Sequence, residues 1–137
     1  METITIHGRK VYPGVVEGEA LVSPDAIGCF GSIKWETGIV TEKGHALFGE
    51  CLKGKVLVFP SAKGSSSWGS TFQSLRYYGN APAAMLIKVI DGKSGLGAVL
   101  SHTPSMTDFD ENPLEIIEDG DWVKVDADNG VVTVTKK

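Results

Sequence analysis

The sequence has few of the residues from which metal sites are usually built. Its 137 residues include two cysteines, Cys29 and Cys51, and no CxxC pair. Two cysteines with this separation do not make a zinc site by themselves, and an iron–sulfur cluster takes about three or four thiolates. We therefore expect no metal or cluster to be bound by this chain alone, and both thiols to be buried or half-buried.

Positive charge and long apolar runs are also scarce. The formal net charge is -4 and the isoelectric point is near 5.3, with no basic stripe of the kind that nucleic-acid binders carry. No apolar run approaches the roughly 20 residues of a membrane-spanning helix, and the amino end shows no signal-peptide pattern. The sequence thus predicts a soluble cytoplasmic protein with neither nucleic acid nor membrane as a partner.

What is present suits one small domain over residues 1–137. The composition, 42% hydrophobic and 22% charged, is enough for one core. Short apolar runs separated by glycine indicate strands, and Asn129-Gly130 is a hairpin signal. The expected strands are residues 4–6, 11–16, 20–22, 56–59, 85–90, 96–100, 122–125 and 131–134. One helix is expected after the serine-rich segment, and residues 92–101 could form a second helix in place of the strand at 96–100. The chain is therefore predicted to be a β-rich α/β domain.

The most informative segment joins a predicted strand to a predicted helix. Val56–Phe59 is an unbroken apolar run that suits a strand covered on both faces. Ser70–Gln73 has the spacing of a capping box and predicts a helix start, and Gly79 offers its stop. The residues between them are small and rich in hydroxyl groups.

This connecting segment has the features of an anion-binding turn. Gly64 lets the backbone turn without a side-chain penalty, and the helix start presents unpaired amide protons to a carboxylate or phosphate. It is not a nucleotide P-loop, because Lys63 precedes Gly64 instead of following the second glycine.

Several motifs follow one another from about residue 8 to the end of the chain. They are Glu17–Ser23, Glu36–Val40, Gly44–Gly49, Phe59-Pro60 followed by Lys63-Gly64-Ser65, Asn80–Ile87 and the closing Gly120–Asp126. Together these motifs resemble one known family, the small subunits of aconitase X-type dehydratases. The chain departs from the family pattern at Ser32, Lys34, Trp68 and Ser101–Pro104, which are expected to lie on the ligand side.

The resemblance implies a fold, an activity and a partner. The fold is a swivelling β/β/α domain of the aconitase small-domain type. The activity is that of a hydro-lyase that dehydrates a small hydroxy-carboxylate and works only with a large catalytic subunit. That partner is expected to carry the iron–sulfur cluster or iron.

The resemblance also implies roles for residues of the connecting segment. Ser65 would be the proton acceptor. A serine hydroxyl is a poor base, so Lys63 and the helix start would have to activate it. Lys63, Gly64, Ser66 and Ser67 are the expected substrate-binding residues, while Ser70 is assigned to helix capping.

Substrate and function class remain open at this point. The departures favour cis-3-hydroxy-L-proline as the substrate, with phosphomevalonate as the alternative. A phosphoryl-carrier module is disfavoured because serines, not histidine, occupy the strand-to-helix turn, and a non-catalytic anion-binding module would keep the segment without the role of Ser65. Other polar residues have two interpretations each, site or ordinary surface and turn: Arg9, Arg76, His45, His102 and the acidic cluster Asp108, Asp110 and Glu111.

Overall fold

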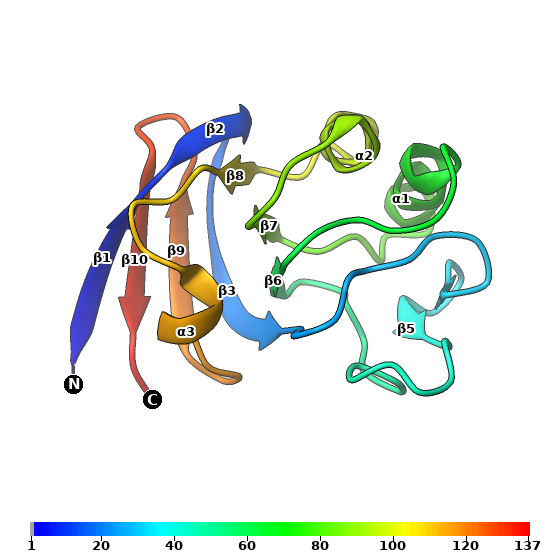
Figure 1. Ribbon diagram of the computed structural model, residues 1–137, viewed down its shortest axis with the longest axis horizontal. Coiled ribbons are helices and arrows are strands. Elements are labelled where there is room, and N and C mark those ends of the chain that lie inside the picture. Colours follow the sequence, from blue (N-terminus) through cyan, green and yellow to red (C-terminus); the bar gives the residue numbers. More distant parts are fainter. Residues whose placement is uncertain (1) are drawn as a thin grey trace.

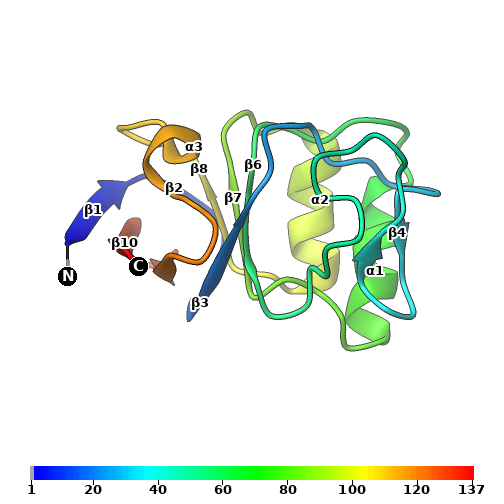
Figure 2. The same cartoon turned by 90° about the horizontal axis from the view of Figure 1, so that it is seen from below.

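The computed structural model describes residues 2–137 and arranges them in three layers, seen edge-on in Figure 2. The strands are β1 (Thr3–His7), β2 (Arg9–Tyr12), β3 (Val15–Val22), β4 (Ile33–Lys34), β5 (Ile39–Val40), β6 (Val56–Phe59), β7 (Ala84–Ile87), β8 (Ser105–Thr107), β9 (Trp122–Asp126) and β10 (Val131–Thr135). The helices are α1 (Trp68–Tyr77), α2 (Gly92–Ser101) and α3 (Pro113–Ile116). No helix of residues 2–137 is long and apolar enough to cross a membrane.

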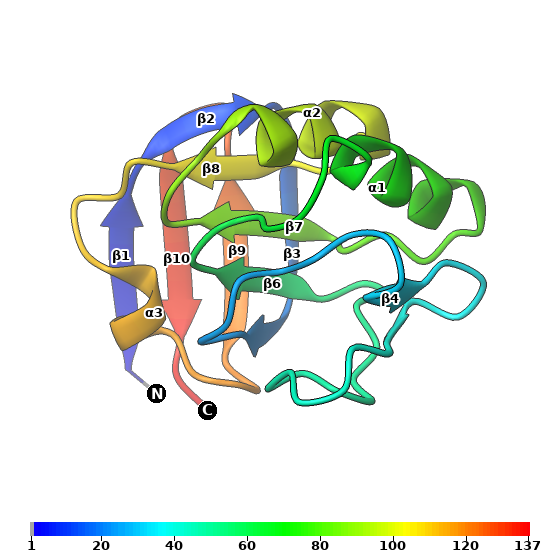
Figure 3. The same cartoon turned by 45° about the vertical axis from the view of Figure 1, so that its right-hand side comes forward.

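Eight strands form one sheet that folds back on itself. Their order is β1-β10-β9-β3-β6-β7-β8-β2, and β4 pairs with β5 separately. The pairs from β1 to β3 are antiparallel, the pairs from β3 to β8 are parallel, and β2 closes the row antiparallel to β8. Since β1 and β2 are consecutive in the chain but lie at opposite ends of the order, the sheet must double over. Figure 3 shows β6, β7 and β8 crossing in front of β9.

Two hydrophobic cores separate the three layers. Strand β6 supplies both, because alternate side chains of a strand point to opposite faces. Val56 and Val58 belong to the core with the antiparallel strands, whereas Leu57 and Phe59 belong to the core under the helices. All four β6 residues are fully buried, as the apolar run predicts, and the result is the predicted β/β/α layering.

Helices α1 and α2 lie side by side over the parallel strands (Figure 1). Their close approach needs Gly97 on α2, because a Cβ there would lie 2.2 Å from the ring of Trp68. The structure therefore resolves the ambiguity at residues 96–100 in favour of helix. Asp91 caps that helix, and its side chain accepts a hydrogen bond from the Ser94 amide at 2.9 Å.

The strand expected at residues 85–90 ends at Ile87, and two other predicted boundaries were also wrong. The single strand expected at residues 11–16 is split into β2 and β3, because Gly14 has a φ of +137° and packs against Pro104. Helix α1 begins at Trp68, not at the predicted capping box, and the side chain of Ser70 bonds to the Ser67 carbonyl from within the first turn.

The predicted hairpin at Asn129-Gly130 is confirmed, and it joins β9 to β10. Only Gly130 of the pair has a positive φ, 70°, while Asn129 is held by two hydrogen bonds to the Asp126 carboxylate. The ends of the described chain lie together, because β1 pairs with β10 at Thr3 and Thr135.

Candidate active site

The candidate site is the loop of residues 60–67, hereafter the serine loop, which connects β6 to α1. The middle of the loop and the first residue of α1 are fixed to one carbonyl group. The backbone N–H of Lys63 and the ring Nε1–H of Trp68 each donate to the Ile27 carbonyl oxygen at 2.9 Å. The serine loop therefore packs along the segment that follows β3, and this contact positions the hydroxyl groups between its anchors.

Trp68 is the anchor that the sequence interpretation did not explain. Its side chain is fully buried, and its ring stacks on Phe72 at a centroid distance of 4.0 Å and on Phe59 at 6.1 Å. The spacing of Trp68, Phe72 and Leu75 at i, i+4 and i+7 is the helical signal that could have placed it in the core. Trp68 thus joins the end of the serine loop to the core under the helices.

Ser65, Ser67 and Cys29 form a compact cluster on the serine loop and the segment beside it. The two serine hydroxyl oxygens are 2.6 Å apart, and the Ser67 N–H also donates to the Ser65 hydroxyl at 3.2 Å. The Cys29 sulfur lies 3.5 Å from the Ser67 hydroxyl and 3.8 Å from the Ser65 hydroxyl. Ser65 is exposed, whereas Cys29 is buried beneath it.

The environment of Cys29 favours its thiolate. Burial raises the pKa of the Cys29 thiol, but hydrogen bonds from Ser67 and from the backbone at Phe30 and Ser65 outweigh burial and lower that pKa below 9.0. Gly64 permits the close approach, since it has a φ of +97° and a Cβ there would lie 3.1 Å from the sulfur.

Lys63 points to a carboxylate from the neighbouring segment. Its Nζ lies 2.6 Å from one oxygen of Glu42, and the Ser32 hydroxyl donates to the other at 3.0 Å. The hydrogen bond from Lys63 lowers the pKa of the Glu42 carboxyl, with Ser32 adding to the effect against the opposing effect of burial. Glu42 and Ser32 were not among the predicted site residues.

The start of α1 supplies further donors to the site. The first N–H groups of a helix have no partner within it, and the Ser67 side chain at the N-cap makes no capping bond. The Ser67 hydroxyl is instead directed to Ser65, and Ser66 is exposed on the same loop. Of the predicted residues, Ser65 and Ser67 are thus brought together, Gly64 shapes the turn, and Lys63 is engaged by Glu42.

The histidines make ordinary structural contacts. The N–H of Leu47 donates to His45 Nδ1 at 3.0 Å, so the ring proton is on Nε2 and is donated to the Ala26 carbonyl at 2.9 Å. His102 ends α2 with a φ of 53° and stacks on Tyr12. Neither histidine lies on the serine loop.

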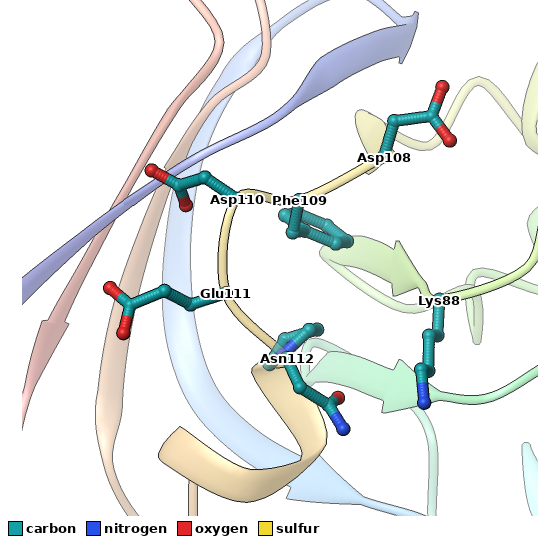
Figure 4. Close-up of a pocket in the computed structure, with 7 residues that line it drawn as sticks. Lys88, Asp108, Phe109, Asp110, Glu111 and Asn112 are labelled. Carbon is teal, nitrogen blue, oxygen red and sulfur yellow. The ribbon is translucent and has the colours of Figure 1, made fainter.

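The acidic cluster near α3 does not converge on one point. Asp108 pairs with Arg9 at 2.7 Å, and Asp110 pairs with His7 at 3.4 Å. Lys88 follows the end of β7, and the acidic residues follow the end of β8. Figure 4 shows the Asp110 and Glu111 side chains turned away from Lys88. Within residues 2–137 no group of three or more His, Cys, Asp or Glu side chains is placed to hold a metal ion.

The layering and the serine loop define a class of protein: a swivelling β/β/α domain that presents a polar strand-to-helix loop on its surface. A family model described as the aconitase X swivel domain matches residues 5–134. The chain belongs to this family.

Named relatives and a solved structure agree with this membership. The chain is 41% identical over 130 residues to the phosphomevalonate dehydratase small subunit of Methanocella arvoryzae, covering 95% of this chain and 98% of the relative. It is 39% identical over 132 residues to that of Methanococcoides burtonii, covering 96% of each. The holo-form crystal structure of Thermococcus kodakaraensis aconitase X superposes with a TM-score of 0.90 at 33% identity, covering 97% of this chain and 99% of that one.

Proposed function

We propose that this chain is the small subunit of a phosphomevalonate dehydratase, in which Ser65 accepts the proton removed from the substrate. The observation that carries the proposal is the exposed Ser65 hydroxyl, which is bonded to Ser67 at the start of α1. A hydroxyl held in this way can meet a substrate carbon without rearrangement of the loop.

The named relatives favour phosphomevalonate over the hydroxyproline substrate that the sequence departures suggested. Two of those departures, Trp68 and Ser32, have local structural explanations. Trp68 is a core anchor, and Ser32 supports the Glu42 carboxylate. The hydroxyproline interpretation is therefore replaced by its alternative.

The proposed reaction removes a proton from the carbon next to the substrate carboxylate and expels the hydroxyl group from the following carbon. Ser65 takes the proton. The start of α1 stabilises the charge that develops on a substrate carboxylate or the charge of a phosphate, because the dipole of a helix favours an anion at its amino end. Lys63 adds a cation at the rim of the loop and is held in place by Glu42.

A large partner subunit completes the proposed site. The serine loop is exposed at Lys63–Ser66, so this chain does not enclose a substrate. An iron–sulfur cluster, which takes about three or four thiolates, does not fit this chain: Cys29 is committed to the serine cluster and Cys51 bonds to the Thr37 carbonyl. We place the cluster or iron in the partner, and the assembled enzyme in the cytoplasm.

The test is reconstitution of the two subunits followed by an assay with both substrates. The purified complex is incubated separately with 5-phosphomevalonate and with cis-3-hydroxy-L-proline, and loss of water is followed by mass spectrometry. We expect dehydration of phosphomevalonate only, and only with both subunits present. Turnover of hydroxyproline instead, or failure to bind a large subunit, would overturn the proposal.

A further inference from the structure

We infer that Cys29 is the final proton acceptor of a relay that runs from the Ser65 hydroxyl through the Ser67 hydroxyl to the Cys29 sulfur. The inference rests on the proposed function and extends it from the proton-accepting serine to the group that makes that serine a base.

The proposed reaction requires a base that takes the proton of the Ser65 hydroxyl, and the relay supplies one. A serine hydroxyl accepts a proton effectively only when its own proton leaves, so such serines work beside a stronger base. Lys63 was the expected activator, but its ammonium group is bonded to Glu42. The titratable side chain in contact with the Ser65 and Ser67 hydroxyls is Cys29.

The geometry connects the three groups in sequence. Ser65 and Ser67 share a short hydrogen bond of 2.6 Å, and Ser67 lies nearer to the sulfur, at 3.5 Å, than Ser65 does, at 3.8 Å. Because Ser67 makes no capping bond with its side chain, its hydroxyl is available to pass a proton. Gly64, which leaves room for the sulfur, keeps the cluster compact.

The hydrogen bonds to the Cys29 sulfur make its ionisation easier. Its hydrogen-bond donors lower the thiol pKa despite burial. Glu42 would oppose a thiolate, but its carboxylate is paired with the Lys63 ammonium group at 2.6 Å.

The proton transfers balance over one turnover. The substrate C–H bond breaks, and its proton passes to the Ser65 oxygen while the Ser65 proton moves to Ser67 and the Ser67 proton to the Cys29 thiolate. The electron pair of the C–H bond forms the carbon–carbon double bond, and the C–O bond to the leaving hydroxide breaks. The Cys29 thiol then gives up its proton, which with the hydroxide accounts for the water released.

The kinetic test uses Cys29→Ala and Cys29→Ser in the reconstituted complex, with Cys51→Ala as the matched control. General-base catalysis is worth about 100-fold or more, so we expect both Cys29 variants to lose about 100-fold in kcat with little change in KM. The serine hydroxyl can hold the hydrogen bonds but does not ionise at neutral pH, so its failure to rescue separates proton acceptance from packing. We also expect the acid limb of the kcat profile, set by the thiolate in the wild type, to change in Cys29→Ser.

A second measurement does not depend on turnover. In the Cys51→Ala background, the ultraviolet absorbance of the thiolate reports the titration of Cys29, and Ser67→Ala is expected to raise the thiol pKa by removing a donor. An unchanged titration, or a Cys29→Ser complex as active as the wild type, overturns the relay while the dehydratase function stands. A wild-type complex inactive on phosphomevalonate overturns the proposed function, and the relay with it.

Discussion

The antiparallel and parallel halves of the folded sheet differ in how their strands are buried and connected. In the antiparallel half, strands β1, β9 and β10 alternate buried and outward residues, and adjacent strands β9 and β10 are joined by a tight turn. In the parallel half, strands β6 and β7 are buried throughout, and their crossover connections carry α1 and α2. The candidate site belongs to the parallel half.

The difference follows from how the strands are connected. Parallel strands need long crossovers, which place loops and helix starts together at the carboxyl ends of the strands. The antiparallel half instead uses its buried charge for stability. Asp121, which is fully buried before β9, accepts a hydrogen bond from Lys136 beyond β10 at 2.5 Å and from the Glu118 amide at 2.8 Å. Substitutions in the two halves should therefore separate activity from stability.

The largest expected effect is the loss of turnover on Ser65→Ala in the parallel half. Removal of a general base typically costs about 100- to 10,000-fold in rate. Because Ser65 is exposed, we expect thermal unfolding of the chain to be nearly unchanged. Ser70→Ala is the control, since Ser70 lies in the first turn of α1 and bonds only to the Ser67 carbonyl. Near-normal turnover of Ser65→Ala in the reconstituted enzyme would contradict the assignment.

Trp68→Ala should affect both stability and activity, because Trp68 links the serine loop to the core. Removing a buried tryptophan costs about 4 kcal/mol in the free energy of unfolding, measured by urea denaturation. Trp122→Ala in the antiparallel half is the matched control. Trp122 is 49% exposed, so its loss should cost less than about 1 kcal/mol and leave turnover intact. Equal losses in the free energy of unfolding for the two variants would contradict the anchoring role of Trp68.

Asp121→Asn should lower stability without changing kcat. Burial raises the pKa of Asp121, but hydrogen bonds from Lys136 and from the backbone at Glu118 and Lys137 outweigh it and hold the pKa below 3.8. A lowered folded-state pKa gives stability that is present above the unfolded value and is lost as pH falls through the folded value. We expect a loss of about 3 kcal/mol at neutral pH, from breaking a buried pair.

The pH dependence supplies the check on this assignment. The difference between wild type and Asp121→Asn should shrink below about pH 4, measured by urea denaturation across pH. Glu118→Gln is the control, because Glu118 also pairs with Lys136 but its side chain is 70% exposed, and its loss should cost less than about 1 kcal/mol. A constant difference between wild type and Asp121→Asn down to low pH would refute the ionic contribution of Asp121.

Local signals predicted most of the fold correctly. The apolar run at Val56–Phe59 and the hairpin at Asn129-Gly130 were readable because burial and turn chemistry act over a few residues. The start of α1 was misplaced, because the capping-box spacing at Ser70 is a local preference that the burial of Trp68 overrides. The serine-rich loop itself was identified, but not the neighbours that surround it.

The sequence by itself determined the β-rich α/β class, the family and the hydroxyl-rich connection that carries Ser65. Only the tertiary structure decided which groups meet that serine. Cys29 and Glu42 come from segments well before the serine loop, and they reach it because Ile27 bridges to Ala62 and accepts two hydrogen bonds there. Contacts between distant segments depend on the register in which the strands pack, and no short pattern in the sequence encodes that register.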